Sequence, residues 1–586
     1  MSIRMSTSPR LQRIPRTRTT LARMAVNAAL AGAWAALLLA LLPFFLNADV
    51  PLTPRNYSSL AGPMVLFYAP ASGLLWALLA GVVRLFAAFR VRVPWLGFRP
   101  FWRFLVADLW VLTLLYGVNL RQARDYLPAS MTEILLGATL LLGVVTVVLT
   151  VDALWRGLGR RRPRPRAALA AMLLLTAGLF ALRARVHPLV PPPSASEFQP
   201  PEPARGVLLL GLEGASPNDF LPMVADGRLP HLQDFLREGS SAPLSSPRPA
   251  GAQAAWATVR TGLVPAAHGL VSDRHLLPPG GRPRFRLPPA GILLDLPAAL
   301  GLVRLEVGES ATRERSTVAD ILGRCGYRVI DLGWPATGAS APRSRAGEKL
   351  PDALVSHVEA LRSHLAVARN AEDGGPLARV LAQALAADLA VGRAALAEVM
   401  KVSGEGVTPA VLVRFTGLDR VGRAFLRYQR PHHFGNVTDD ELDRYGAVLP
   451  DYYRFMDAWL GILRQATGAD SRLMVISPYG IEPVSLMTRA GNALRGRWYD
   501  AGTDRGRSPG VLLAAGPGFR VEARLESARA EDVLPTLLYL LDLPVGRDMD
   551  GQPLPRFASD AFADEHAVSA VPSWDTVTVV PPVAVW

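Results

Sequence analysis

The sequence predicts an α-helical membrane region followed by a three-layer α/β/α domain with a mainly parallel central sheet. Three observations lead to this prediction. Residues 1–187 of the 586-residue chain contain five long apolar runs, residues 188–204 are rich in proline, and short apolar runs alternate with amphipathic segments over residues 205–560. Apolar runs of about 20 residues can cross a bilayer as helices. Strands that alternate with helices are typical of a parallel sheet covered on both faces.

The five apolar runs are predicted to be membrane spans. Core helices of soluble proteins are rarely apolar on every face over such lengths, so we favour spans over buried helices. The first run is too long for the apolar region of a signal peptide and lacks a small-residue cleavage site, so we expect it to be retained. The runs lie at about residues 24–46, 64–89, 104–120, 134–154 and 167–182.

Arginine placement predicts the orientation of these spans. Arg residues concentrate in segments 1–23, 90–103 and 156–166, whereas the other two connecting loops carry few. Positively charged loops stay on the cytoplasmic side, so these segments, and the N-terminus with them, are predicted to be cytoplasmic. Five spans then place the large domain on the opposite side, as an extracytoplasmic or periplasmic domain anchored in the lipid of the cytoplasmic (inner) membrane.

Two charged residues fall inside the predicted spans. If the second span runs inward and the third outward, Arg84 and Asp108 lie at similar depth near the inner side. A lone charge at the bilayer centre costs about 2.5 to 3.5 kcal/mol on insertion scales. We therefore predict that Arg84 and Asp108 pair. A proton or ion relay is the alternative, but it would need more ionisable residues within the membrane.

The charge distribution argues against a nucleic-acid partner. Residues 1–187 carry 22 Arg against five acids, a net +17, and because the whole chain carries +14 the remaining residues carry −3. A nucleic-acid-binding domain is expected to be basic. The chain has one cysteine, Cys325, so no internal disulfide can form. A buried thiol is a more common role for a lone cysteine than a nucleophile.

The region after the Pro-rich linker is predicted to contain at least five buried strands and four helices. No role is assigned to the tail at 561–586. Residues 274–314, rich in Pro and Gly, are interpreted as an inserted loop over the site or, alternatively, as a partner surface. Runs of consecutive apolar residues indicate strands, and apolar stripes at helical spacing indicate helices. The strands are predicted at Gly206–Leu212, Tyr327–Gly333, Ala410–Phe415, Leu473–Ser477 and Gly510–Ala515, and the helices at Leu229–Glu238, Thr317–Cys325, Leu377–Met400 and Asp439–Gln465.

Several short motifs in this region resemble, in order, those of one family. They are Gly211–Ser216, Gly227–Pro230, Trp256–Gly262, Pro265–Gly269, Gly326–Pro335, Phe415–Arg420, Gly510–Leu513, Asp532–Leu538 and Asp548–Gly551. Together they resemble the type I phosphodiesterase and nucleotide pyrophosphatase family of the alkaline phosphatase superfamily. The resemblance implies an alkaline phosphatase-like fold, with two divalent metals such as zinc that activate a Thr or Ser nucleophile.

Most positions that would carry this chemistry differ in the present chain. Glu213 stands where the family has a metal-binding Asp, and Ala252, which has no oxygen, stands at the nucleophile position. The Asp-x-x-x-His element keeps its acid as Asp419, but its His is replaced by Arg423. A guanidinium group has no lone pair available to bind a cation.

The remaining metal positions differ as well. Pro478 and Tyr479 stand where the family has the Asp and His of a Ser-Asp-His-Gly segment, and Asp504 replaces the His of a Gly-x-His segment. A tetrahedral site usually needs at least three protein ligands, so by the resemblance we expect no bound metal and no catalytic residue. We also predict that the guanidinium of Arg423 takes the first metal position and bridges Asp419 and Asp504.

These departures favour an inactive, phosphodiesterase-like domain that binds a ligand or partner in the cell envelope. A phosphate-containing compound, a glycan or an envelope protein would be consistent with this interpretation. One alternative is an active metal-dependent phosphodiesterase or phospho-head-group transferase with rearranged ligands. Another is a membrane scaffold of an envelope assembly, in which the membrane array is the working part and the outer domain serves as the scaffold.

Overall fold

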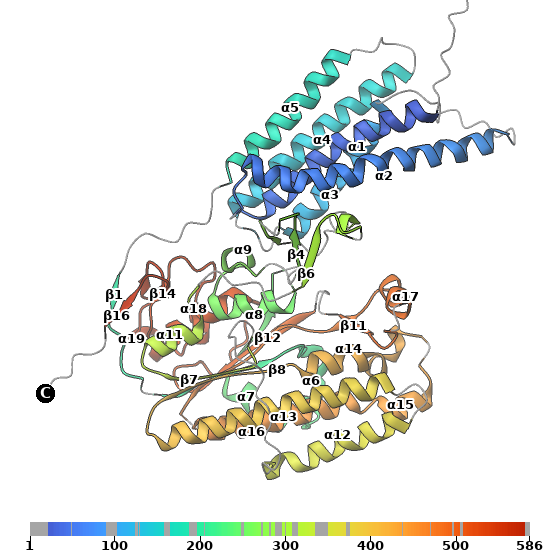
Figure 1. The fold of residues 1–586 in the computed structure, drawn as a ribbon. Helices are drawn as coiled ribbons and strands as arrows, with labels where there is room; N and C mark the ends of the chain where they lie inside the picture. Colours follow the sequence, from blue (N-terminus) through green and yellow to red (C-terminus); the bar gives the residue numbers. More distant parts are fainter. Residues whose placement is uncertain are drawn as a thin grey trace, which may run out of the picture.

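The structure is a computed structural model of the whole chain. It describes residues 21–88 except 49, residues 102–123, 127, 129–157 and 165–186, residues 196–247 except 204, and residues 251–270, 274–280, 283–286, 296–298, 300–307, 315–334 and 350–370. It further describes residues 375–494 except 436 and 469, and residues 497–503 and 508–580. A helical bundle and a larger α/β domain make up these residues (Figure 1).

The bundle contains five helices, as predicted from the apolar runs. Four of them are long and apolar enough to cross a membrane, and the described apolar part of the fifth, Leu169–Ala184, is shorter. Leu114 and Leu174 are among the many large apolar side chains that remain exposed on the bundle surface, as expected where lipid is the solvent. The helices are α1 (Leu21–Leu46), α2 (Pro54–Ala88), α3 (Trp102–Ala123), α4 (Ala129–Gly157) and α5 (Pro165–Ala184).

Hydrogen bonds between helices hold the bundle together. The hydroxyl of Tyr116 donates to the carbonyl of Leu38 at 2.9 Å, and the hydroxyls of Thr113 and Thr146 lie 3.0 Å apart. Such bonds supplement close packing, since the hydrophobic effect does not drive helices together in lipid. The side chain of Arg84 lies outside the described residues, so its pairing with Asp108 stays a prediction.

A seven-stranded sheet forms the centre of the α/β domain. Six strands run in one direction and β12 runs antiparallel to both of its neighbours, which confirms a mainly parallel sheet. The five predicted strands are all present within it. In spatial order the strands are β13 (Ala528–Arg529), β3 (Gly239–Ser245), β12 (Pro509–Ala515), β9 (Arg472–Tyr479), β2 (Val207–Leu212), β8 (Pro409–Phe415) and β7 (Arg328–Leu332).

Alternate residues of the central strands point to opposite sides of this sheet. Leu208 and Leu210 of β2 face one helical layer, whereas Val207 and Leu209 face the other. The first layer contains α6 (Pro217–Ala225), α7 (Pro230–Glu238), α12 (Asp352–Asn370), α13 (Gly375–Gly404), α14 (Gly417–Gln429), α15 (Asp439–Tyr445) and α16 (Val448–Thr467). The second contains α8 (Ala252–Thr261), α11 (Val318–Arg324) and α18 (Val533–Leu540).

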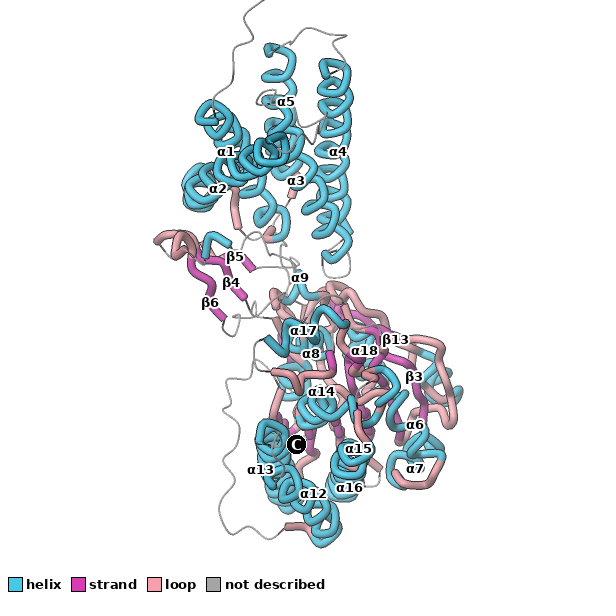
Figure 2. The backbone as a smooth tube through the Cα atoms, turned by 90° about the vertical axis from the view of Figure 1, so that its right-hand side faces the viewer, coloured by secondary structure: helices cyan, strands magenta, loops and turns pink. Residues whose placement is uncertain are grey.

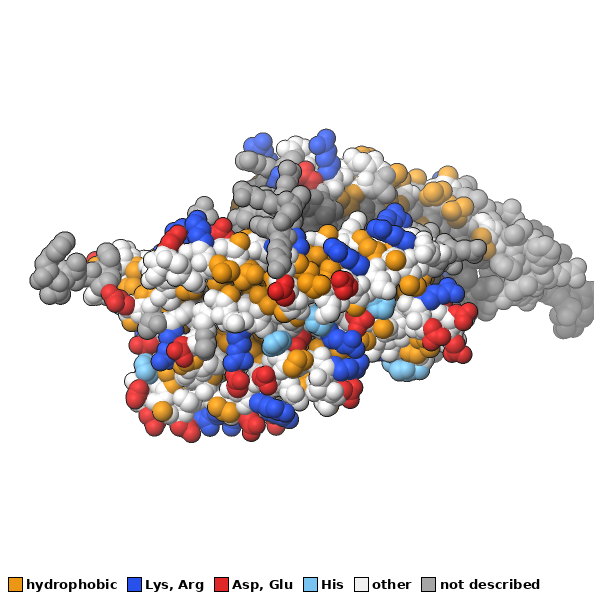
Figure 3. Space-filling model, turned by 90° about the horizontal axis from the view of Figure 1, so that it is seen from below, with side chains coloured by type: hydrophobic (Ala, Val, Ile, Leu, Met, Phe, Trp, Pro, Cys, Tyr) orange, Lys and Arg blue, Asp and Glu red, His pale blue; other side chains and the backbone are white. Residues whose placement is uncertain are grey.

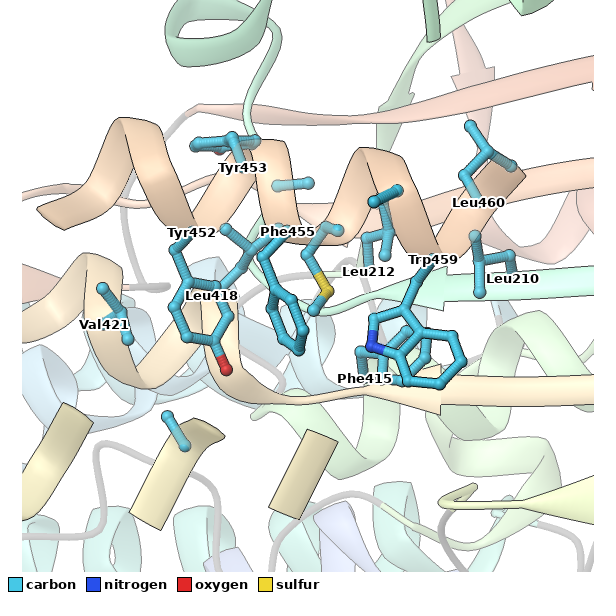
Figure 4. Packing of buried hydrophobic residues seen from close by; sticks show 14 of the residues in the cluster. Leu210, Leu212, Phe415, Leu418, Val421, Tyr452, Tyr453, Phe455, Trp459 and Leu460 are labelled. Carbon is cyan, nitrogen blue, oxygen red and sulfur yellow. The ribbon is translucent and has the colours of Figure 1, made fainter. Parts of the chain in front are cut away.

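Helix α16 supplies the largest side chains of the first layer. Tyr452, Phe455 and Trp459 point from α16 toward the sheet, and Trp459 lies beside Phe415 of β8 with ring centroids 5.9 Å apart (Figure 4). Helix α13 has the length and hydropathy of a membrane span. It nevertheless buries one face against β8 and α14, so it belongs to the α/β domain.

One predicted helix is divided in two. The segment predicted as a single helix over Asp439–Gln465 forms α15 and α16, with a break at Gly446 and Ala447. Pro450 is the reason, because a proline inside a helix lacks the amide donor and clashes with the carbonyl four residues earlier. Proline is tolerated in the first turn, and Pro450 occupies the first turn of α16.

The described part of the 274–314 insertion contains regular structure and is not simply the loop that the sequence predicted. It contains a three-stranded antiparallel sheet of β5 (Phe285–Arg286), β4 (Arg274–Leu277) and β6 (Arg304–Val307). In both Figure 1 and Figure 2 these strands lie between the bundle and the large sheet. Leu276, Phe285 and Val303 belong to the same buried apolar cluster as the bundle helices.

A strap near the end of the chain closes the α/β domain. Strand β16 (Thr578–Val579) pairs in parallel with β1 (Glu197–Phe198), which follows the Pro-rich linker. Trp574 is fully buried beside Phe198, and the indole of Trp574 donates to the carbonyl of Pro544 at 2.8 Å. On the face away from the bundle, acidic and basic side chains are intermixed among the described residues (Figure 3).

Shorter elements complete the described part of the domain. They are α9 (Pro265–His268), α17 (Leu486–Leu494), α19 (Asp560–Glu565), β10 (Glu482–Pro483), β11 (Gly502–Thr503), β14 (Val545–Gly546), β15 (Ala570–Val571) and the 3₁₀ turns Pro431–His433, Ala530–Asp532 and Pro555–Phe557.

Candidate functional site

The predicted site residues gather at one end of the central strands. Glu213 directly follows β2, Asp419 lies in the first turn of α14 after β8, and Tyr479 is the last residue of β9. The backbone of Gly214 adopts a φ of 83°, and a Cβ at this position would lie 2.8 Å from the Cα of Asp419. Only glycine permits so close an approach. The parallel strands therefore bring both acids to one edge of the sheet, where ligands bind in such folds.

Both carboxylate oxygens of Glu213 have protein donors. The hydroxyl of Tyr479 donates to Oε1 at 2.6 Å, and Nη1 of Arg414 donates to Oε2 at 3.0 Å. The side chains of Glu213 and Arg414 are mostly buried. Tyr479, which stands at a predicted metal-ligand position, therefore contributes a hydroxyl donor to Glu213.

Arg414 is fixed by two further contacts. Its Nε donates to the carbonyl of Gly333 at 2.6 Å, and its guanidinium lies 5.6 Å from the ring centroid of Trp256. A guanidinium held by a carboxylate, a carbonyl and an aromatic ring has little freedom to leave. Arg414 is therefore a fixed positive charge beside Glu213.

Arg423 neutralises the second acid. Its Nε and Nη2 donate to the two carboxylate oxygens of Asp419 at 2.8 and 2.9 Å, a bidentate pair within one turn of α14. The structure thus contains the Arg423–Asp419 part of the predicted cluster. Asp504 lies outside the described residues, so its part stays a prediction. The chain does return to Arg423 at Ala501, whose amide donates to the carbonyl of Arg423 at 2.8 Å.

A buried acid in the next layer positions the turn that carries Asp419. Asp388 of α13 accepts hydrogen bonds from the amides of Thr416 and Gly417 at 3.1 and 3.0 Å and from the hydroxyl of Tyr452 at 2.8 Å. These bonds satisfy amide groups at the start of α14, which have no partner within the helix. Asp388 is thus a positioning residue for the site edge.

Burial dominates the electrostatics of these acids. Burial raises the pKa of Glu213, and the nearby charge of Asp419 raises it further, whereas Arg414, Tyr479 and Arg423 lower it. Burial also raises the pKa of Asp388, to about 6, against the lowering effect of its three hydrogen bonds. Two carboxylates and two guanidinium groups nearly balance at the site edge, which removes the electrostatic demand for a dication.

Ala252, the predicted nucleophile position, is the first residue of α8. Its methyl group leaves no oxygen at the start of a helix where an attacking hydroxyl would stand. Pro478 stands at another predicted ligand position, and its carbonyl accepts a hydrogen bond from the hydroxyl of Ser246.

The described residues do not fit the two metals that the resemblance implies. All four carboxylate oxygens of Glu213 and Asp419 lie within 3.0 Å of a nitrogen or hydroxyl donor from Arg414, Arg423 or Tyr479. A dication near either acid would stand against a guanidinium group. Among the described residues, no group of three or more His, Cys, Asp or Glu side chains has a geometry suited to a metal ion.

Sequence reasoning missed Arg414, Asp388 and Tyr452. Arg414 had a usable signal, because a charged residue inside a short apolar strand needs a buried partner. Asp388 gave a similar signal within the apolar face of α13. Tyr452 did not, since its place in an aromatic stripe is equally typical of a core residue.

Comparisons with known proteins gave one family match and several similar solved structures. A model of the family described as type I phosphodiesterase / nucleotide pyrophosphatase matches residues 207–538. Among solved structures, murine ectonucleotide pyrophosphatase/phosphodiesterase 5 is 15% identical, with 62% of this chain and 100% of that chain covered and a TM-score of 0.33. An inactive form of the same murine protein in complex with AMP is 14% identical, with 62% of this chain and 99% of that chain covered and a TM-score of 0.32. A comparison with curated protein sequences gave no match.

Proposed function

The chain belongs to the type I phosphodiesterase and nucleotide pyrophosphatase family, and we propose that within this family it is a membrane-anchored pseudoenzyme. In this proposal the outer domain retains the family fold but does not hydrolyse phosphodiesters. It acts instead by binding a ligand or partner on the extracytoplasmic side of the cytoplasmic membrane. A phosphate-containing compound, a glycan or an envelope protein is the proposed class of ligand.

One observation carries the proposal. The chain's own donors, Tyr479, Arg414 and Arg423, occupy the carboxylate oxygens of Glu213 and Asp419 that metals would need. Two-metal phosphoryl transfer depends on those ions to activate the nucleophile and stabilise the developing charge. With Ala252 at the nucleophile position, the described residues supply neither function.

The proposed location rests on the helices and the Arg distribution. The bundle provides apolar helices suited to a membrane, and the positive-inside rule assigns the Arg-rich loops to the cytoplasm. The Pro-rich linker and the outer domain then follow on the other side.

Metal content and hydrolysis of the purified full-length protein test the proposal. We expect the protein, purified without chelator, to contain no stoichiometric Zn²⁺ or Mn²⁺ by mass spectrometry. We also expect no hydrolysis of bis-p-nitrophenyl phosphate with or without added metal. The variant Glu213→Ala/Asp419→Ala is the matched control, because it removes the two acids at the described edge of the sheet and defines the background rate. Metal-dependent turnover above that background would favour the active phosphodiesterase or head-group transferase instead.

A specific observation also supports a scaffold role as second candidate. The β5–β4–β6 sheet shares its apolar cluster with the bundle, so the outer domain is held against the membrane region as a fixed platform. Deletion of the outer domain separates the two roles. If the truncated protein still captures the partner, the membrane region binds it. If capture is lost, the outer domain binds the partner.

A further inference from the structure

The insertion between β5 and β6 presents an apolar tip beside the bundle. The tip, residues 296–303, has the sequence Leu-Pro-Ala-Ala-Leu-Gly-Leu-Val. The side chain of Leu300 is 69% exposed and that of Leu296 is 42% exposed. Exposed leucines so close together are unusual on a surface that faces only water, and such patches often mark an interaction site.

Contacts with α1 fix the height of this tip relative to the membrane. The ring of Phe285 in β5 packs edge to face against the ring of Phe44, with centroids 4.9 Å apart. Phe44 lies two residues before the end of α1, so at 1.5 Å per residue it is only about 3 Å from the point where the helix ends. The small sheet therefore lies at the level where the apolar span gives way to water.

The tip itself packs against the apolar cluster of the bundle. Val303 is buried in the bundle cluster, and Ala298 packs partly against it. Leu296 and Leu300 flank Ala298 in the sequence, and their side chains remain exposed. Both views of the fold show β4 and β6 next to the bundle, on its side toward the outer domain (Figures 1 and 2). The surroundings of a membrane bundle at this level are the boundary of headgroups and acyl chains.

The charges next to the tip match such a boundary. Arg304 directly follows the tip and is exposed. Arg284, which precedes β5, is also exposed and lies 3.7 Å from the carboxylate of Glu306, an exposed pair of the kind that water and salt weaken. Arginine side chains at membrane interfaces extend their charged ends toward lipid phosphates while apolar neighbours enter the acyl region. An apolar tip beside cationic residues is the composition of segments that lie in a membrane interface.

We propose that the 296–303 tip inserts Leu296 and Leu300 into the outer boundary of the lipid bilayer. The outer domain then contacts lipid directly, in addition to its tether through the five helices. The contact sets the distance and tilt of the outer domain relative to the membrane. It is independent of whether the phosphodiesterase-like site is active.

Site-specific fluorescence in nanodiscs tests this proposal with the full-length chain. The only native cysteine, Cys325, is buried, so Leu300→Cys and Leu296→Cys can each be labelled selectively with the environment-sensitive dye NBD. Met400→Cys is the matched control, because Met400 is 66% exposed on α13, far from the bundle. The unmodified chain reports background labelling.

Two quenchers distinguish lipid from water and from protein. We expect the dyes at positions 296 and 300 to emit at shorter wavelength than the dye at 400. Acyl-chain nitroxide lipids should quench them, and iodide should quench them several-fold less than it quenches the dye at 400. Strong iodide quenching without nitroxide quenching would refute the proposal. Protection from both quenchers would also refute it, since it would indicate that a second copy or another protein covers the tip.

Discussion

The hydroxyl of Tyr479 donates a 2.6 Å hydrogen bond to Oε1 of Glu213, so a tyrosine and a glutamate meet directly at the edge of the sheet. Tyr479→Phe removes this donor and leaves a buried charged oxygen without it. Loss of a hydrogen bond to a charged group should lower the free energy of unfolding by about 1.5 to 3 kcal/mol. Thermal unfolding followed by tryptophan fluorescence measures the change. Tyr499→Phe, which makes a similar change at a half-buried position, should have little effect.

Arg414 and Glu213 should behave as a coupled pair. Arg414→Met leaves Glu213 buried beside an apolar side chain, and breaking a buried ion pair from one side costs about 3 to 5 kcal/mol. Addition of Glu213→Gln to this variant should recover much of the loss, because the remaining partner is then neutral. A double-mutant cycle in urea measures the coupling free energy. Equal and additive losses in the two single variants would contradict a direct pair.

Arg520→Met is the control for this cycle. Arg520 pairs with Asp560 at an exposed position, and exposed ion pairs contribute at most about 1 kcal/mol. A loss at position 520 as large as that at 414 would mean that removal of any arginine destabilises the domain.

Asp388 should make stability depend on pH in mildly acidic solution. Its pKa in the folded protein is raised to about 6, whereas an unfolded aspartate titrates near about 3.9. Between these values the folded protein binds more protons than the unfolded chain, so stability falls as pH rises through this window. The full effect is about 3 kcal/mol. Asp388→Asn removes the titration, so its unfolding midpoint should depend less steeply on pH between about 4 and 6 than that of the native chain.

The exposed Asp560→Asn is the control for this comparison. It should preserve the native slope because the Asp560 side chain is largely in water. Parallel pH profiles for the native chain and Asp388→Asn would show that the pKa of Asp388 is not raised.

Restoration of the nucleophile alone should not restore hydrolysis. Ala252→Thr supplies a hydroxyl at the start of α8, but Pro478, Tyr479 and Arg423 still leave no metal to activate it. The combined variant Ala252→Thr/Pro478→Asp/Tyr479→His/Arg423→His returns three ligand positions to residues that bind zinc. Bound zinc, measured after dialysis, should increase only in the combined variant. Turnover by Ala252→Thr alone would show that a metal already binds.

The main elements of the fold could be predicted because their signals are local. Uniform apolar runs indicated the bundle helices, and the runs around Leu210 and Leu412 indicated buried parallel strands. Arg423 was placed against Asp419 because four-residue spacing brings side chains together on one helix. The continuous helix predicted through Gly446 was wrong, although Pro450 gave a local signal against it.

The rest of the site depends on contacts between distant parts of the chain. Glu213, Arg414 and Tyr479 come from three different strands, and only the register of the sheet brings them together. The insertion likewise gave no pattern strong enough to indicate that Phe285 packs on Phe44. Composition indicated an irregular segment, whereas the contact with α1 depends on tertiary structure.

The strap formed by β1 and β16 affects the order in which the α/β domain can fold during synthesis. Phe198 lies near the start of the domain sequence and packs against Trp574, which lies near its end. This contact can form only after Trp574 has been synthesised. Strand β2 pairs with β8 and β9, which both follow it by about 200 residues or more in the sequence, so these pairings also form late. Pairings between distant segments form slowly. Almost the whole domain must therefore be synthesised before its core can close, and its apolar strands stay exposed until then, which favours aggregation of the incomplete chain.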